Sequence, residues 1–185
     1  MKIIKVSPFD ECPIYESQHF AFRLVEEADA GSLLSCYSDP KSAPIFNSDN
    51  CNSDFIYHTV EDVLKLIQFW IMEYNNRGYV RFSVLDKKIN QAIGTIEIFS
   101  FDKTNESLGF LRLDLASKYE TSTHLDDVFY MIDCYFKDDF EIDGIVTKAI
   151  PEATTRINTL TKKGYHPLKD STITSYGDYH IKRWS

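Results

Sequence analysis

Residues 80–96 read VRFSVLDKKINQAIGTI, and this stretch decides the fold. Each half is a short run rich in apolar and β-branched residues, which is typical of a β-strand. The mainly polar residues 86–90 separate the halves and indicate a turn. The second strand is expected to run over residues 91–101. After a turn at 102–106, a third strand over 107–115 extends the hairpin into an antiparallel meander.

Helical patterns precede the meander. A strand at residues 20–25 leads into a helix that ends before residue 39. The polar stretch 41–58 follows, and loops of that length in compact domains are usually functional or mobile. Thr59 then begins a capping-box pattern and a strongly amphipathic helix, for which Gly78 supplies an expected C-terminal cap.

After the meander the apolar period changes from 2 to 3.6, which predicts a helix up to about residue 139. A strand is expected at 142–149, and Pro151 is expected as the first residue of another helix. A last strand lies within residues 172–184. The order predicts an α+β fold with helices flanking the sheet, in a single domain over residues 1–185 with residues 1–19 as an N-terminal extension.

Composition excludes several functional classes. The net charge of −8 argues against a general nucleic-acid binder and against binding to an anionic membrane, because phosphates are bound by clustered Lys and Arg. No apolar run has the roughly 18 to 20 residues of a membrane helix, and the N-terminus does not resemble a signal peptide. The four cysteines are scattered, which favours a cytoplasmic location. The five histidines have no metal-ligand spacing, so no metal site is predicted.

Three strings resemble the GNAT N-acetyltransferase superfamily, in the branch that contains ribosomal-protein N-terminal acetyltransferases. They are FAFRLVEEADA at 20–30, residues 80–96, and LTKKGY at 160–165. The resemblance implies a mixed, mostly antiparallel sheet with one splayed pair of parallel strands, here 107–115 and 142–149. It also implies acetyl-CoA as cosubstrate and direct acetyl transfer to a small amine or a peptide N-terminus. It leaves a homodimer open.

The resemblance also implies where the chemistry takes place. The thioester would lie between the splayed strands, and backbone N–H groups at the start of the following helix would bind the pyrophosphate, since orphan N–H groups and the helix dipole form an anion site. Asp114 and Glu97 are the candidate general bases. The candidate cofactor-binding residues are Leu113, Leu115, Thr121, Ser122, Thr123, His124, Leu125, Lys148 and Arg156.

Each of these assignments has a structural alternative. Asp114 could pair with Arg112 instead of acting as a base. Glu97 lies on a partly apolar strand face, which suits a base but also suits a structural carboxylate. Lys148 and Arg156 could contact the cofactor phosphates or be solvated.

The pyrophosphate loop departs from the family pattern. Glu120 stands where the family has Arg or Gln, and Thr123 and Leu125 stand at two small-residue positions, the first of them always glycine. Segment 114–127 holds one lysine against four acidic residues, and the position of the family's general-acid tyrosine is Leu160. These departures motivate a second hypothesis, a catalytically weakened GNAT-like module that binds a ligand or partner without transferring an acetyl group.

Overall fold

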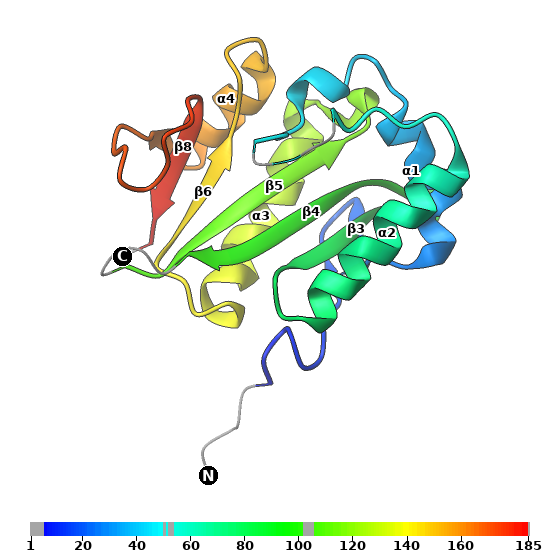
Figure 1. Ribbon diagram of the computed structural model, residues 1–185. Coiled ribbons are helices and arrows are strands. Elements are labelled where there is room, and N and C mark those ends of the chain that lie inside the picture. The colour runs from blue at the N-terminus through cyan, green and yellow to red at the C-terminus, as the bar shows by residue number, and fades with distance from the viewer. Residues whose placement is uncertain (1–5, 50, 52–53, 102–105, 185) are drawn as a thin grey trace.

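The computed structural model describes residues 6–49, 51, 54–101 and 106–184, and its centre is one mixed sheet (Figure 1). Within these residues the sheet has eight strands in the order β1-β2-β3-β4-β5-β6-β8-β7. The strands are β1 Tyr15–Glu16, β2 Phe20–Leu24, β3 Val80–Asp86, β4 Gln91–Phe101, β5 Leu108–Leu115, β6 Gly144–Lys148, β7 His166–Pro167 and β8 Tyr179–Arg183. All neighbouring strands are antiparallel except β5 and β6.

The predicted meander is confirmed as β3, β4 and β5, and the expected mixed, mostly antiparallel sheet is confirmed with it. The register places Arg81 opposite Glu97, and Glu97 opposite Arg112. At Gly94 the two strands approach so closely that a Cβ atom would lie 2.1 Å from the carbonyl oxygen of Asp114. A glycine is therefore required there for β5 to pair along its whole length with β4.

Helices cover both faces of the sheet (Figure 1). α1 and α2 lie on one face, and α3 and α4 lie on the other. The four α-helices of the described residues are α1 Ala30–Tyr37, α2 Val60–Asn75, α3 Ser122–Asp139 and α4 Thr154–Lys162. The predicted cap of α2 is confirmed, since Thr59 Oγ1 accepts a hydrogen bond from the Asp62 N–H at 3.1 Å. None of the helices in the described part of the chain has the length and apolar content that crossing a bilayer requires.

Two helix ends differ from expectation. Pro151 is not the first residue of a helix, because Ala153 N–H donates to the Ile150 oxygen at 2.9 Å and Pro151 occupies the turn that this bond closes. At the end of α2 the left-handed residue is Arg77 (φ 59°) rather than Gly78. Residues 102–105 of the predicted 102–106 turn lie outside the described residues.

Strands β5 and β6 separate along their length, as Figure 1 shows. Their parallel pairing begins at Leu108 with Gly144 and ends at Leu111 with Thr147. β5 nevertheless continues to Leu115, so its residues 112–115 pair with β4 on one side and have no register with β6 on the other. We call this region, residues 112–115 of β5 and Lys148 of β6, the β5–β6 divergence. It corresponds to the splayed parallel pair that the resemblance implied.

Candidate functional site

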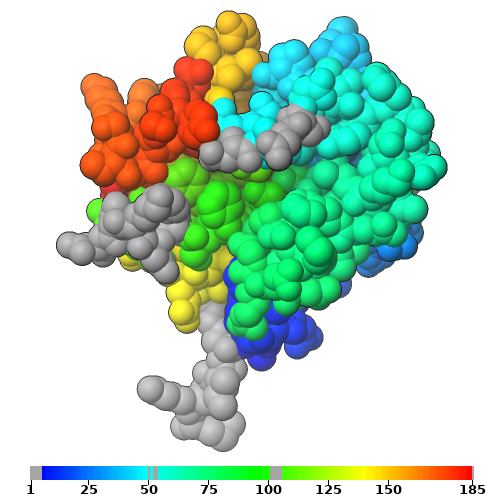
Figure 2. Space-filling model, in the orientation of Figure 1, coloured from blue at the N-terminus to red at the C-terminus, as the bar shows by residue number. Residues whose placement is uncertain are grey.

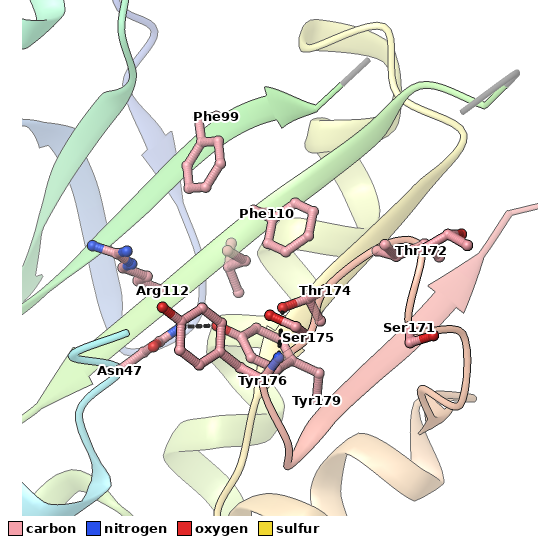
Figure 3. A pocket seen from close by; sticks show the side chains of 12 residues that line it. Asn47, Phe99, Phe110, Arg112, Ser171, Thr172, Thr174, Ser175, Tyr176 and Tyr179 are labelled. Carbon is pink, nitrogen blue, oxygen red and sulfur yellow. Dashed lines mark hydrogen bonds between the residues drawn. The ribbon is translucent and has the colours of Figure 1, made fainter. Parts of the chain in front are cut away.

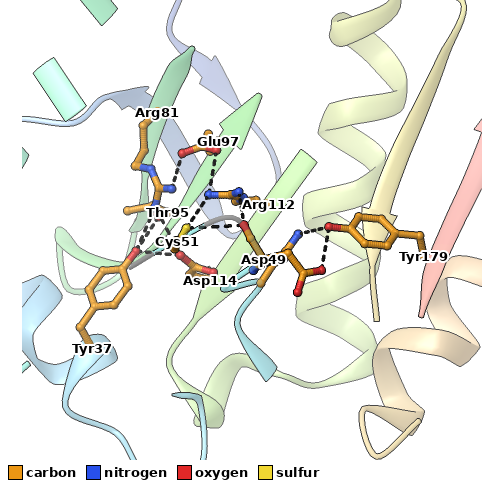
Figure 4. Close-up of polar contacts among 10 residues, drawn as sticks. Tyr37, Asp49, Cys51, Arg81, Thr95, Glu97, Arg112, Asp114 and Tyr179 are labelled. Carbon is orange, nitrogen blue, oxygen red and sulfur yellow. Dashed lines mark hydrogen bonds and ion pairs between the residues drawn. The ribbon is translucent and has the colours of Figure 1, made fainter. Parts of the chain in front are cut away.

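Asp49 bridges the β5–β6 divergence. Figure 4 shows this residue between Arg112 and Tyr179. Arg112 and Lys148 are the first residues after the last paired positions of their strands, and both bind Asp49. Arg112 Nη2 donates to the Asp49 carbonyl oxygen at 2.8 Å, and Lys148 Nζ lies 2.8 Å from each carboxylate oxygen. The Tyr179 hydroxyl donates to the same carboxylate at 3.1 Å and accepts from the Asn47 amide at 2.9 Å. The long polar stretch thus fastens the two separating strands together on the face that carries α1 and α2.

Both candidate bases belong to a buried network around Arg81 (Figure 4). Arg81 is 1% exposed. Its Nη2 donates to Glu97 Oε2 at 2.5 Å, and its Nη1 lies 3.3 Å from Asp114 Oδ2. The Tyr37 hydroxyl donates to the same Asp114 oxygen at 3.0 Å. The guanidinium stacks over the Trp70 ring with its Cζ 4.0 Å from the ring centroid.

The network gives its two carboxylates different properties. Burial raises the pKa of Asp114, and this effect outweighs the opposing charge of Arg81 and the hydrogen bond from Tyr37. In the described residues, Asp114 Oδ1 is buried with no hydrogen-bond partner. Both carboxylate oxygens of Glu97 form ion pairs. Oε2 pairs with Arg81, and Oε1 lies 3.5 Å from Arg112 Nη1. Asp114 therefore keeps one buried oxygen without a hydrogen-bond partner, whereas both oxygens of Glu97 are held in ion pairs.

Arg81 stays charged in this setting. Burial alone lowers the pKa of Arg81, but the nearby Glu97, Tyr37 and Asp114 raise it to a value above the ordinary one. The pKa of the Tyr37 hydroxyl lies well above its usual range because of burial and the charge of Asp114. Tyr37 is accordingly a neutral donor, and Arg81 is the fixed positive charge between two carboxylates.

The sequence did not single out Arg81, Tyr37, Asp49 or Tyr179. A signal was present for Arg81, because polar residues alternate on three consecutive strands and the register brings them onto one face. These residues are Arg81 and Ser83 on β3, Thr95 and Glu97 on β4, and Arg112 and Asp114 on β5. Asp49, Tyr37 and Tyr179 carry no such signal, since their contacts join segments far apart in the chain.

The start of α3, where the resemblance implies a pyrophosphate site, is capped by its own residues. Thr121 Oγ1 accepts from the His124 N–H at 3.4 Å and lies 3.0 Å from His124 Nδ1. Leu125 places its side chain in the core, and its N–H donates to the Thr121 oxygen at 2.9 Å. Ser122 and Thr123 are exposed, and their N–H groups belong to the first turn, which has no intrahelical acceptor.

The two basic residues that are candidates for cofactor phosphates, Arg156 and Lys148, are each paired with an acidic residue, and only Lys148 is partly exposed. Arg156 is 2% exposed and forms an ion pair with Glu120, in which its Nε lies 3.3 Å from Glu120 Oε2. Lys148 is bound by Asp49, as described above. Leu160, at the position of the family's general-acid tyrosine, is fully buried in the core.

The acidity of segment 114–127 is compensated by groups outside it. Glu120 pairs with Arg156, and Asp126 lies 3.0 Å from Lys163 Nζ. Asp127 accepts from the N–H groups of residues 18 and 19 and from a serine hydroxyl. With Asp114 bound to Arg81, all four acidic side chains have partners, and three of the four pair with a basic residue from outside the segment.

Two cavities lie next to each other on the face that carries α2. The first, which we call the aromatic cavity, has a volume of about 550 Å³. It is lined by Cys51, Phe55, Tyr57, Leu66, Phe69, Trp70, Glu73, Gly78, Tyr79, Arg81, Glu97, Phe99 and Arg112. Glu97 therefore faces this cavity, whereas Asp114 is not one of its lining residues.

The second cavity is about 380 Å³ and is bounded by hydroxyl-bearing residues of the segment 171–176 (Figure 3). Its floor contains the stacked rings of Phe99 and Phe110, whose centroids lie 5.4 Å apart. It shares Phe99 and Arg112 with the aromatic cavity, so the two cavities adjoin at β4 and β5. Figure 2 shows the surface of these strands recessed between α2 and the C-terminal segment.

Solved structures share this architecture. Ribosomal-protein-S5-alanine acetyltransferase from Vibrio fischeri is 17% identical, with a TM-score of 0.69 over 92% of this chain and 96% of that one. RimJ from Mycobacterium smegmatis, solved in complex with CoA-disulfide, is 12% identical, with a TM-score of 0.71 over 92% of this chain and 86% of its own. A GNAT-family acetyltransferase from Bacillus anthracis is 14% identical, with a TM-score of 0.67 over 92% of this chain and 98% of that one.

Neither a protein-family model nor a curated protein matches the sequence. The likeness is therefore one of fold: a mixed sheet, a parallel pair of strands that separates after Leu111, and helices on both faces. On these grounds the chain has the fold of the GNAT acetyltransferases, as the resemblance of its sequence implied.

Proposed function

We propose that this protein is an acetyl-CoA-dependent N-acetyltransferase whose cofactor enters the β5–β6 divergence. The observation that carries the proposal is the end of strand pairing at Leu111 and Thr147, four residues before β5 ends. The side chains of Leu113 and Leu115 are buried, so their contribution would come from the backbone along the unpaired edge of β5. Peptide groups on such an edge can pair with the amides of the cofactor arm.

The N-terminus of α3 supplies the proposed pyrophosphate site. The backbone of residues 121–125 would approach the phosphates, with the N–H groups of Ser122 and Thr123 as donors. Lys148 and Arg156 remain candidates for phosphate contacts, but each would first have to exchange its acidic partner for the phosphate. The RimJ neighbour was solved with a CoA derivative, which supports a CoA site in this fold.

The proposed chemistry is direct transfer in a ternary complex. The nitrogen of a neutral amine attacks the thioester carbon, the carbon–sulfur bond breaks, and the thiolate of CoA leaves with the bonding electrons. Asp114 receives the amine proton, because it lies on the stretch of β5 that borders the divergence and has a free oxygen. Glu97 stabilises positive charge on the acceptor side, where it lines the aromatic cavity.

The acceptor is a small amine or a peptide N-terminus. Two of the neighbours are named as ribosomal-protein acetyltransferases, which supports a peptide acceptor, and the aromatic cavity supports a small amine. The four cysteines are free thiols, which agrees with action in the reducing cytoplasm.

A second function has its own supporting observation. Asp49 bridges the divergence on one face, and the Glu120–Arg156 pair lies where the cofactor would meet α3. If the Asp49 bridge and the Glu120–Arg156 pair persist in solution, the protein would be a GNAT-like binding module without transferase activity. The two functions differ in whether acetyl-CoA binds.

A thermal-shift titration with acetyl-CoA decides between them. At a hundredfold excess over Kd, a specific ligand stabilises the folded state by about 2.7 kcal/mol, which for a chain of this size raises Tm by roughly 5–10 °C. We expect such a rise with acetyl-CoA and with CoA, and none with an equal concentration of ATP as a polyphosphate control. An unchanged Tm at millimolar acetyl-CoA would reject the transferase and favour the binding module.

A further inference from the structure

The aromatic cavity has one acidic side chain that the Arg81 network does not use. α2 presents Leu66, Phe69, Trp70 and Glu73 to the cavity at helical spacing. Glu73 is half-buried, and among the described residues it has no basic partner at ion-pair distance. Its carboxylate lies over Gly78, where a Cβ atom would be only 2.6 Å from Glu73 Oε2. The absence of a side chain at Gly78 therefore keeps this carboxylate at the wall of the cavity.

The other charged side chains that line the cavity are held in ion pairs. Arg81 and Arg112 both pair with Glu97, and Arg81 also pairs with Asp114. Among the described residues that line the cavity, Glu73 is therefore the charged group without an ion-pair partner. A cavity that contains a carboxylate without an ion-pair partner and several aromatic side chains attracts a cation, through charge and through the ring faces.

The remaining walls determine what the cation is attached to. Phe69 is 49% exposed, and Leu66 and Tyr79 are partly exposed beside it. Apolar surface of this kind is stabilised when an aliphatic or aromatic chain covers it. The volume of about 550 Å³ lies within the usual range for small-molecule sites.

We infer that the aromatic cavity binds the acceptor and that the acceptor is a diamine on an apolar chain, with one ammonium group at Glu73. The acceptor role rests on the proposed function. Arg112 lines the cavity and is also the first residue of the β5–β6 divergence. The far end of the diamine would therefore reach the point where the thioester would lie. The ammonium at Glu73 remains charged and anchors the molecule, while the second amine, once neutral, is the nucleophile. A carboxylate at the same place would be repelled by Glu73.

Isothermal titration calorimetry without acetyl-CoA tests this inference. The probes are 1,8-diaminooctane, octylamine and octanoate. We expect the two amines to bind, with the diamine tighter, and octanoate to show no binding. Octanoate that binds as tightly as octylamine would overturn the inference, because the cavity would then select only for apolar surface.

Matched variants locate the cation. Glu73→Gln removes the charge but keeps the size of the side chain, and we expect it to weaken diamine binding about tenfold. Glu61→Gln on the same helix is the control, since Glu61 is solvent-exposed and pairs with Lys65, and it should change Kd less than twofold. Phe69→Ala should weaken binding severalfold through lost apolar contact. If Glu73→Gln and Glu61→Gln bind the diamine with equal affinity, the ammonium group does not lie at Glu73.

The calorimetry is independent of the proposed function, because it requires no cofactor. Diamine binding together with an unchanged Tm in acetyl-CoA would reject the transferase and leave the cation site standing. A normal rise of Tm in acetyl-CoA with no diamine binding would reject the cation site and leave the transferase standing.

Discussion

Replacing Arg81 with methionine is expected to lower the free energy of unfolding by about 3–5 kcal/mol. Arg81 is 1% exposed, and its guanidinium is the basic group that binds both Glu97 and Asp114 in the sheet. Methionine fills a similar volume but leaves two buried carboxylates without this partner. Uncompensated buried charge is among the largest single-residue costs in folded proteins.

Urea denaturation at neutral pH measures this loss. The matched control is Arg77→Met, because the Arg77–Asp10 pair has the same chemistry with both side chains 56% exposed. An exposed pair contributes between 0 and about 1 kcal/mol, so the control should be nearly neutral. If Arg81→Met costs no more than Arg77→Met, Arg81 does not hold the network together.

Replacing Asp114 with asparagine is expected to reduce kcat by about 10²–10⁴, the usual contribution of a general base. The amide keeps the shape of the side chain and can still accept the hydrogen bond from Tyr37, but it cannot take a proton. Glu97→Gln is the matched comparison, since Glu97 binds the same arginine and faces the cavity. We expect Glu97→Gln to act mainly on KM for the amine and Asp114→Asn mainly on kcat.

The pH profile separates a base from a structural carboxylate. Burial raises the pKa of Asp114, and a base works only when deprotonated. The rate of the natural protein should therefore fall as the pH drops through this raised pKa, and Asp114→Asn should lose that limb of the profile. If the variant retains more than a tenth of kcat with the same limb, Asp114 is not the base.

Much of the fold is predictable from local sequence. The hairpin in residues 80–96, its extension by β5 and the Thr59 cap depend on periodicity and on residues close in sequence, and all are confirmed. The start of α4 is not predictable in this way. Pro151 suits both the first turn of a helix and the second position of a turn, and only the surrounding structure selects the turn.

The candidate site is only partly predictable because its contacts are long-range. Asp114 and Glu97 are on the expected strands, but their shared partner Arg81 follows from register, which sets which residues face each other. Counting charges over segment 114–127 misses the basic partners from outside it, Arg156 of α4 and Lys163 at the C-terminal cap of α4. Asp49, from a polar stretch without periodicity, reaches the divergence through tertiary contacts alone.

The cofactor site is tested most directly by amide hydrogen exchange with and without saturating acetyl-CoA. We expect slower exchange along residues 112–115 of β5, in the backbone of residues 121–125, and at the end of β6, because these groups would become bound or covered. Exchange in β1 and in the C-terminal turn of α2 should be unchanged and serves as the internal control. Unchanged exchange at 112–115 and 121–125, or protection confined to residues 171–176, would contradict binding of acetyl-CoA in the β5–β6 divergence.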